Sequence, residues 1–220
     1  DRAWAHAVAG LKPDLVHLRK VRADAAIAPL LARAGFRSSG PQQAPAMDFG
    51  TSPDFSAYEQ RYSAKARKNR RRLLRRLEEQ GEVRFVHLAP SAEAAATAAR
   101  AIDMKRAWLA HRGLLSPALD DARVAAFFRD ACATPAGDGA TLVSALKLDG
   151  APIAIMVAVT GGDRVAGHIF TYDLAFEKSG AGVLLLEDCL RRACADGYRY
   201  YDLLAPADGY KSDWADHAVE

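Results

Sequence analysis

The segment from Asp163 to Trp214 constrains the fold of this chain most strongly. It has the pattern of a strand (Val165–Tyr172), a loop of small residues, an apolar helix (Val183–Cys194) and a second strand (Tyr198–Leu204). A strand–helix–strand unit of this kind joins two parallel neighbours in one sheet. The loop Glu177-Lys178-Ser179-Gly180-Ala181-Gly182 places backbone N–H groups at a helix N-terminus, which favours an anion there. The segment therefore predicts an α/β domain with an anion site.

The residues before this segment predict antiparallel strands. Thr141–Leu148 and Pro152–Thr160 are joined by Asp149-Gly150, a dipeptide typical of a tight hairpin. Gly161-Gly162 is a second turn, and it leads into the strand Arg164–Asp173. Three hairpin-linked strands followed by the crossover predict a mixed sheet in an α/β (α+β) domain.

Three helices are expected between Tyr58 and Pro135. Tyr58 to Gln80 has apolar residues at three- and four-residue steps and predicts one helix, followed by the strand Glu82–Leu88. Ser91 is suited to cap an alanine-rich helix that runs to Arg112 and ends at Gly113. Ser116-Pro117 predicts the start of a third helix, which ends before Pro135.

The first 57 residues are less defined. Leu15–Val21 alternates in the manner of a strand, and Ala23–Ala34 predicts a helix that Gly35 ends. Arg37–Asp54 is rich in Ser, Gly, Gln and Pro and predicts a linker with one short strand. Too few apolar residues are present here for an independent domain.

Composition places the chain among ordinary globular proteins. Half of its 220 residues are hydrophobic, yet its longest apolar stretch, Ala151–Val159, is only as long as a strand, so no transmembrane segment is expected. No secretory signal precedes the fold, and Cys132, Cys189 and Cys194 form no CxxC pair. We therefore expect reduced cysteines, no metal site and a cytoplasmic location.

The basic character of the chain is confined to one segment. Arg61 to Arg76 contains nine Lys and Arg residues and no acid, so this segment has a charge of +9. Because the whole chain has a net charge of +3, the remaining residues together carry −6. Its cations are suited to nucleic acid, to an anionic membrane surface or to an anionic substrate. A solvated face of a structural helix is the fourth alternative, and contact with a substrate or partner is slightly favoured over it.

The order of elements resembles the acyl-CoA N-acyltransferase (GNAT) fold. Members of that family bind pyrophosphate with a loop of the form Arg/Gln-x-x-Gly-x-Gly/Ala, and residues 177–182 occupy the corresponding place. The loop departs from the pattern at its first position, because Glu177 replaces Arg or Gln. The carboxylate of Glu177 does not help to hold a pyrophosphate, although its backbone can serve.

From Tyr58 onward the chain is similar to the BioF2-like or CelD-like branch of GNAT-like proteins, many of which are linked to bacterial polysaccharide production. The resemblance rests on five short stretches: Arg67-Lys68-Asn69-Arg70-Arg71-Arg72, Lys105 with Trp108, Tyr172-Asp173, Tyr201-Asp202-Leu203-Leu204, and Tyr210-Lys211 with Trp214. This branch is related to the Fem-type aminoacyltransferases, and both have two GNAT-like halves. The resemblance implies that residues 1–57 are a remnant of a first half with its linker. Residues 58–220 would then be an acyltransferase domain truncated at its C-terminus.

The resemblance implies transfer of an acyl group, such as acetyl, from coenzyme A to an amine of a small molecule, a sugar or a cell-envelope or polysaccharide precursor. Tyr210 would be the acid, and a backbone N–H of Ile169–Asp173 would hold the oxyanion. Asp202, at the carboxyl end of a parallel strand, or His168 would accept the proton of the amine. Strand alternation puts His168 on the same face as Phe170 and Tyr172, although a lone strand histidine is more often structural.

The expected contacts follow from the same comparison. Acyl-CoA would contact Phe170, Tyr172, Lys178, Ser179, Gly180, Ala181, Gly182 and Val183. The acceptor would contact Lys105, Trp108, Arg71, Tyr172, Asp173 and Lys211. Lys105 shares the apolar face of its helix with Ile102 and Leu109, so it either snorkels to solvent or reaches into a cleft.

Two alternatives remain open at this point. A Fem-like transferase would take its aminoacyl group from tRNA and would not bind CoA. A non-catalytic binding module would use only the basic helix, with no need for Tyr210 or Asp202.

Overall fold

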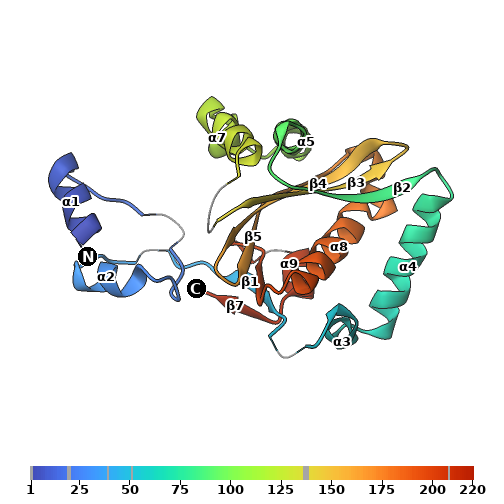
Figure 1. The fold of residues 1–220 in the computed structure, drawn as a ribbon, viewed down its shortest axis with the longest axis horizontal. Helices are drawn as coiled ribbons and strands as arrows, with labels where there is room; N and C mark the ends of the chain where they lie inside the picture. Colours follow the sequence, from blue (N-terminus) through green and yellow to red (C-terminus); the bar gives the residue numbers. More distant parts are fainter. Residues whose placement is uncertain (1, 19–20, 39, 51, 136–138, 208) are drawn as a thin grey trace. The chain divides into compact units, whose positions relative to one another are not determined.

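The computed structural model describes residues 2–18, 21–38, 40–50, 52–135, 139–207 and 209–220, which form two compact units. The larger unit is Met47–Leu203, and the smaller unit combines Asp1–Ala46 with Leu204–Glu220. Figure 1 shows the elements of both. Within the described ranges, every helix is too short or too polar to span a lipid bilayer.

The larger unit contains the elements that sequence patterns predicted best. Its helical elements are α3 (Phe55–Tyr58), η1 (Glu59–Arg61), α4 (Ala64–Glu78), α5 (Ala92–His111), α6 (Pro117–Asp120), α7 (Ala122–Ala133), η2 (Leu174–Ser179) and α8 (Ala181–Ala195). Its strands are β2 (Val83–Leu88), β3 (Thr141–Leu148), β4 (Ala151–Gly161), β5 (Arg164–Tyr172) and β6 (Tyr200–Asp202).

The five strands lie in the order β2-β3-β4-β5-β6, with antiparallel pairs except for the parallel pair β5–β6. The turn between β3 and β4 has positive φ at both Asp149 (48°) and Gly150 (80°), as a type I′ hairpin turn requires. The mixed sheet and the β5–α8–β6 crossover confirm the predicted fold class.

Helices cover both faces of this sheet: α5 and α7 one face, α8 the other (Figure 1). The inner side of α5 carries Ala94, Ala98, Ala101 and Ile102, which share one helical stripe and are buried. Small side chains let the helix approach the strands closely, so the core forms against Val157 and its neighbours. The Ser91 cap is confirmed, since its Oγ accepts from the Ala94 N–H at 3.1 Å.

The prediction of one continuous helix over Tyr58–Gln80 is wrong at Tyr62. Tyr62 is extended (ψ 145°), and Ser63 begins α4 as an N-cap whose Oγ accepts from the Ala66 N–H at 3.1 Å. The Tyr62 ring is held edge-on to Tyr58 and lies under the Arg70 guanidinium. These contacts and the cap outweigh the helical pattern at this position.

The helix expected after Ser116 is also divided. Ser116 caps α6 as predicted, but Asp121 is extended (ψ 120°) and starts α7 by accepting from the Arg123 N–H at 2.8 Å. The side chain of Arg123 lowers the pKa of Asp121 to about 2, so this capping group is a carboxylate at neutral pH.

The smaller unit contains α1 (Arg2–Leu11), α2 (Ala28–Arg33), α9 (Tyr210–Trp214) and an antiparallel ladder between β1 (Ala44–Asp48) and β7 (His217–Val219). Only the first residues of β1, up to Ala46, belong to this unit. The helix predicted over Ala23–Ala34 is shorter than expected, while Gly35 follows it at φ 77°. Residues 15–18 and 21 form no strand, contrary to the prediction, and residues 19–20 lie outside the described ranges.

Candidate functional site

The predicted anion loop lies between the end of β5 and the start of α8. Leu174–Ser179 form the 3₁₀ helix η2, and Gly180 turns the chain in the left-handed region (φ 72°) to begin α8. Gly180 has no side chain to cap the helix. The first amides of α8, from Ala181 to Val183, have no acceptor within the helix, and they lie at the positive end of its dipole.

The glycines of this loop also serve the packing of the chain itself. A Cβ at Gly180 would stand 2.7 Å from Cδ1 of Leu73 on α4, and a Cβ at Gly182 would stand 3.1 Å from Tyr172 Cδ1 and 3.3 Å from Phe170 Cζ. Phe170 and Tyr172 therefore lie against the first turn of α8. The structure thus brings together the predicted donor-binding residues of β5 and α8.

A cluster of aromatic and charged side chains lies beside this turn. Trp108 on α5 has the Lys105 ammonium 4.2 Å and the Arg112 guanidinium 4.4 Å from the centre of its ring. Its ring also meets that of Tyr172 edge-on, with 6.4 Å between centroids. Lys105 and Trp108, both predicted on the acceptor side, are thus close to the end of β5. The sequence analysis did not predict Arg112 as a site residue. Its spacing from Lys105 and Trp108 nevertheless places the three side chains on one face of α5.

Glu177, which breaks the family pattern, is tied to this cluster. Its carboxylate accepts a hydrogen bond from the Tyr172 hydroxyl at 3.2 Å and forms an ion pair with Arg112. Lys178, the next residue, is exposed. The loop therefore places one negative and one positive side chain next to each other at the start of α8.

Two polar atoms near the end of β5 are buried without a partner. These are Nε1 of Trp108 and Oγ1 of Thr171, for which the described residues offer no hydrogen bond. By strand alternation Thr171 shares the α5 face of the sheet with Ile169, a member of the core cluster on that side. Buried polar groups without partners are costly, so a ligand that hydrogen bonds to them would relieve this cost.

β5 separates from β6 after a short paired stretch. The pairs end at Ala166 with Asp202, while β5 continues to Tyr172 without a β6 partner among the described residues. Asp202 is 1% exposed and its Oδ2 lies 4.0 Å from Nη1 of Arg164. The predicted location of Asp202, at the carboxyl end of a parallel strand, is confirmed.

A bulge changes the position of His168. The register between β4 and β5 shifts from Val157↔Ile169 to Ala158↔Gly167, which leaves His168 as the extra residue. Its ring lies 6.1 Å from that of Phe128 on α7. Phe170 and Tyr172 instead lie against α8, so the prediction that His168 shares their face is wrong. Strand alternation does not hold through a bulge.

The remaining predicted residues lie elsewhere. Asp173 caps η2 by accepting from the Ala175 N–H at 3.0 Å, and Ser179 ends that element. Arg71 is on the exposed side of α4. Tyr210 and Lys211 belong to the smaller unit, where Lys211 Nζ donates to the carbonyl oxygens of Leu204 (3.0 Å) and Pro206 (3.1 Å).

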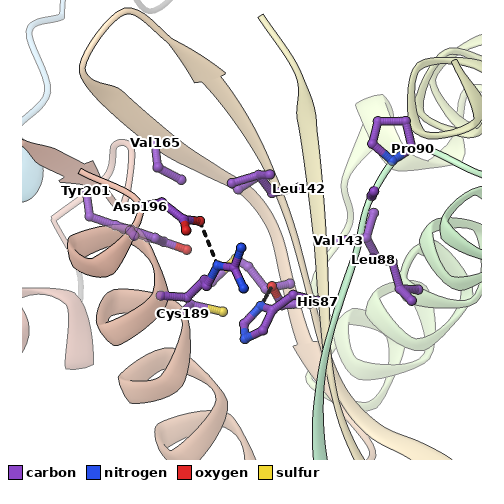
Figure 2. Close-up of a pocket in the computed structure, with 15 residues that line it drawn as sticks. His87, Leu88, Pro90, Leu142, Val143, Val165, Cys189, Asp196 and Tyr201 are labelled. Carbon is purple, nitrogen blue, oxygen red and sulfur yellow. Dashed lines mark hydrogen bonds and ion pairs between the residues drawn. The ribbon is translucent and has the colours of Figure 1, made fainter. Parts of the chain in front are cut away.

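A cavity of about 230 Å³ lies on the α8 face of the sheet and contains none of the predicted site residues (Figure 2). At its wall, His87 Nδ1 and Ser144 Oγ are 2.8 Å apart, and His87 Nε2 lies 2.8 Å from Asp188 Oδ2. The order Ser144–His87–Asp188 is that of a hydrolase triad with the two ring nitrogens exchanged, because in such a triad the serine contacts Nε2 and the aspartate contacts Nδ1. However, Ser144 is on an interior strand and pairs with His87 and Met156, so the neighbouring N–H groups serve the sheet rather than an oxyanion.

The family model for the acetyltransferase (GNAT) domain matches residues 64–212. The chain belongs to this family. GNAT enzymes are acyltransferases that use acyl-CoA as a substrate. No protein with a curated description matches the sequence of the chain.

Solved structures share the fold of this chain. The chain is similar to L-PGS from Bacillus licheniformis, with a TM-score of 0.58 and 17% identity over 94% of this chain and 57% of that one. A conserved protein of unknown function from Bacteroides thetaiotaomicron gives a TM-score of 0.61 and 10% identity over 99% of this chain and 71% of that one.

A third match is the C-terminal DUF2156 domain of a protein described as a lysylphosphatidylglycerol synthetase from Agrobacterium fabrum, with a TM-score of 0.50 and 15% identity over 82% of this chain. This chain spans 52% of that structure and 57% of L-PGS, so about half of each. At these identities the likeness concerns the fold.

Proposed function

We propose that this GNAT domain transfers an acyl group, such as acetyl, from acyl-CoA to an amine. The observation that supports this most directly is the start of α8. There, Gly180 leaves the first amides of the helix without a side-chain cap, and only the short element η2 separates this turn from a strand that has parted from its parallel neighbour. Such amides, at the positive end of a helix dipole, are suited to the pyrophosphate of coenzyme A.

In this proposal the acyl chain of the donor lies along the open part of β5, between Gly167 and Tyr172. A strand that has lost its neighbour has backbone donors on that edge, and one of them in Ile169–Asp173 would stabilise the oxyanion of the tetrahedral intermediate. Phe170, Tyr172 and the turn from Lys178 to Val183 would surround the rest of the donor.

The proton transfers are assigned to two residues. Asp202, buried at the end of β6, would accept the proton of the attacking amine through water. Tyr210 would donate a proton to the departing thiolate. A thiol with an ordinary pKa of about 8.5 leaves without strict need of an acid, so we expect Tyr210 to matter less than Asp202. His168 is the alternative base, and its place beside Phe128 on the α7 side argues for Asp202.

For the acceptor we propose an amine on a sugar or on a precursor of the bacterial cell envelope or of a polysaccharide, as in the BioF2-like branch. Lys105 and Trp108 would contact it, and the partnerless Trp108 Nε1 offers a donor for a hydroxyl or carboxylate oxygen of such a molecule. Asp173 and Lys211 complete the proposed acceptor contacts. We propose that the reaction takes place in the cytoplasm.

The neighbours Glu177 and Lys178 provide the test. Replacing Glu177 with Gln removes a negative charge near the pyrophosphate and releases Arg112, so acetyl-CoA should bind more tightly. Replacing Lys178 with Glu should weaken the binding of acetyl-CoA about tenfold, because the interaction between a charge at a helix N-terminus and a nearby ion is worth on the order of 1 kcal/mol. Isothermal titration calorimetry measures both, and Arg129→Gln on α7 is the control.

Two results would overturn the proposal. In the first, the unmodified chain binds no acetyl-CoA, CoA or longer acyl-CoA. In the second, Glu177→Gln and Lys178→Glu both leave the affinity where Arg129→Gln leaves it. Absence of CoA binding together with binding of a charged tRNA would favour the aminoacyl-tRNA alternative. Unaltered function after Asp202→Asn and Tyr210→Phe would favour a binding module.

A further inference from the structure

Helix α4 has two faces that differ in what their cations do. At about 100° per residue, Arg70 and Leu77 lie close together on one side of the helix, and both are buried. We call this the inner face; it also carries Leu73, which meets Gly180. The opposite side carries only exposed residues.

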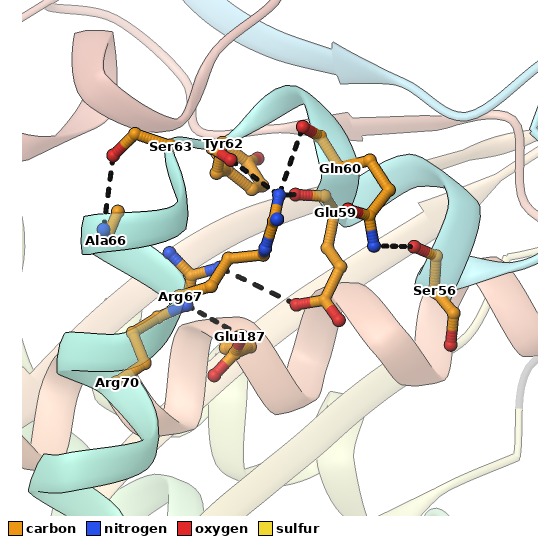
Figure 3. Close-up of polar contacts among 9 residues, drawn as sticks. All are labelled: Ser56, Glu59, Gln60, Tyr62, Ser63, Ala66, Arg67, Arg70 and Glu187. Carbon is orange, nitrogen blue, oxygen red and sulfur yellow. Dashed lines mark hydrogen bonds and ion pairs between the residues drawn. The ribbon is translucent and has the colours of Figure 1, made fainter.

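Arginines on and beside the inner face form hydrogen bonds and ion pairs with other residues of the domain (Figure 3). Arg70 Nε donates to Glu187 Oε1 on α8 at 2.7 Å, and its guanidinium lies 5.1 Å from the centre of the Tyr62 ring. Arg67 Nη1 donates to three carbonyl oxygens at the end of η1, of which Tyr62 O is nearest at 2.7 Å. These contacts fix the rotation of α4 about its axis.

The outer face of α4 consists of six exposed cations: Lys65, Lys68, Arg71, Arg72, Arg75 and Arg76. They occupy an arc of about 140° along a helix of about 22 Å. In the part of the chain that the structure describes, none of the six forms an ion pair with an acid. Arg72 bonds only to the neutral side chain of Asn69.

The spacing on this face is unfavourable for the isolated domain. Lys68 with Arg72 and Arg71 with Arg75 are four residues apart, where like charges weaken a helix. The inner arginines are balanced by Glu187 and Glu59, whereas the outer cations have no such balance. Their arrangement is therefore explained by a partner that supplies many negative charges along a line.

A nucleic acid fits this face better than a membrane does. Helices that lie on membranes insert an apolar face, and the leucines of α4 point inward, with no α4 residue among the exposed large hydrophobic side chains. A duplex carries one negative charge per about 1.7 Å of its axis, which provides phosphates along the whole helix. Arginine, the majority on this face, bonds phosphate with two parallel N–H groups.

We propose that the outer face of α4 binds the phosphate backbone of a nucleic-acid duplex without reading its sequence. The face has no aromatic side chain on which a base could stack, so single strands gain nothing beyond their charge. The proposal does not depend on the acyl donor, because the outer face lies opposite to the side of α4 that packs against the α8 turn.

The experiment uses the full chain and fluorescein-labelled 20-bp duplexes of RNA and of DNA, followed by anisotropy from 25 to 200 mM salt. Each phosphate contact contributes about −0.9 to the slope of log K against log salt, so Arg75→Gln/Arg76→Gln should reduce the magnitude of the slope by about two. Affinity at 50 mM salt should fall at least about tenfold. Arg100→Gln/Arg129→Gln, on α5 and α7, removes the same charge elsewhere and should leave the slope unchanged.

Three outcomes would overturn the proposal. One is an equal decrease, in both double variants, in the magnitude of the slope of log K against log salt, which would mean that only net charge matters. Another is binding to vesicles containing phosphatidylglycerol at concentrations where neither duplex binds. The third is equal binding of polyglutamate of matched charge, which would show that phosphate geometry is irrelevant. Acetyl-CoA titrations of the same variants, expected to be unchanged, keep this result separate from the proposed acyl transfer.

Discussion

Arg70 and Arg71 are neighbours in the sequence and opposites in the structure. Arg70 is 5% exposed and is held by Glu187, Glu59 and the Tyr62 ring, whereas Arg71 is on the outer face of α4. The residue type is the same, so the difference comes only from the rotation of the helix. A run of basic residues thus contains both a structural part and a surface part, and net charge alone does not separate them.

The comparison predicts a large difference in stability. Arg70→Ala should lower the free energy of unfolding by about 2–3 kcal/mol, because it leaves Glu187 and Glu59 near each other without their cation. Arg71→Ala should change it by less than about 0.5 kcal/mol, as for other surface substitutions. Urea denaturation of both variants measures this.

Equal effects of the two substitutions would contradict the division of α4 into two faces. The double variant Arg70→Ala/Glu187→Ala sharpens the comparison. Removal of both charges should cost less than the sum of the two single losses, since the partners are in direct contact.

The inner face should also support the turn at the start of α8. Gly180→Ala should lower the stability by about 2 kcal/mol, because φ is 72° there and the new Cβ would stand 2.7 Å from Leu73 Cδ1. Gly197→Ala is a matched control, since Gly197 has φ 83° and nothing within 4 Å of the added atom. Thermal unfolding of the two variants separates backbone strain from the contact with Leu73.

If Gly197→Ala costs as much as Gly180→Ala, the contact between α4 and the turn contributes little. Leu73→Ala in the Gly180→Ala background should recover the part of the loss that is due to crowding. It should not recover the part that is due to the left-handed backbone.

The smallest expected effect concerns a contrast between a buried and a less buried cysteine on α8, the helix whose Glu187 binds Arg70. Burial raises the pKa of Cys189 to about 12 from its ordinary value of 9.0, and raises that of the less buried Cys194. At pH 8 a thiol reagent should therefore modify Cys194 slowly and Cys189 only after unfolding. Rapid modification of Cys189 in the folded chain would contradict its burial.

The sign of the accompanying pH dependence follows from the raised pKa. The folded chain keeps Cys189 neutral, so this contribution to stability is complete below the unfolded pKa near 9 and declines as pH rises from there toward 12. Cys189→Ala should make the unfolding free energy less dependent on pH in that range, and denaturant titrations at pH 8 and pH 10.5 measure it.

Much of the larger unit was predictable because its signals are local. The Asp149-Gly150 hairpin, the Ser91 cap and the β5–α8–β6 crossover depend on residues close together in the chain. The break at Tyr62 was not predictable, because contacts with Tyr58 and Arg70 hold the ring where the helical pattern would have continued. The bulge at His168 was equally hidden, since its cause lies in the pairing with β4.

The candidate site likewise has a part that local sequence patterns predict and a part that depends on contacts between distant segments. The small-residue turn before α8 follows from strand and helix patterns, and Phe170 and Tyr172 were expected at the donor site from the family resemblance. The pairing of Glu177 with Arg112 does not, because these residues are 65 positions apart and only the packing of α5 against β5 brings them together. The roles proposed for Asp202, Tyr210 and the acceptor contacts stay predictions until the variants above are measured.

The sequence by itself determined the order of elements, the parallel crossover, the glycine turn and the confinement of basic charge to Arg61–Arg76. These features are encoded by periodicity and by residues with special backbone freedom, which act over a few positions. Tertiary structure alone decided which arginines of that segment are buried, and which side chains surround the turn. Those outcomes depend on contacts between segments that are distant in the chain, and helix rotation and strand register are set only when the segments pack.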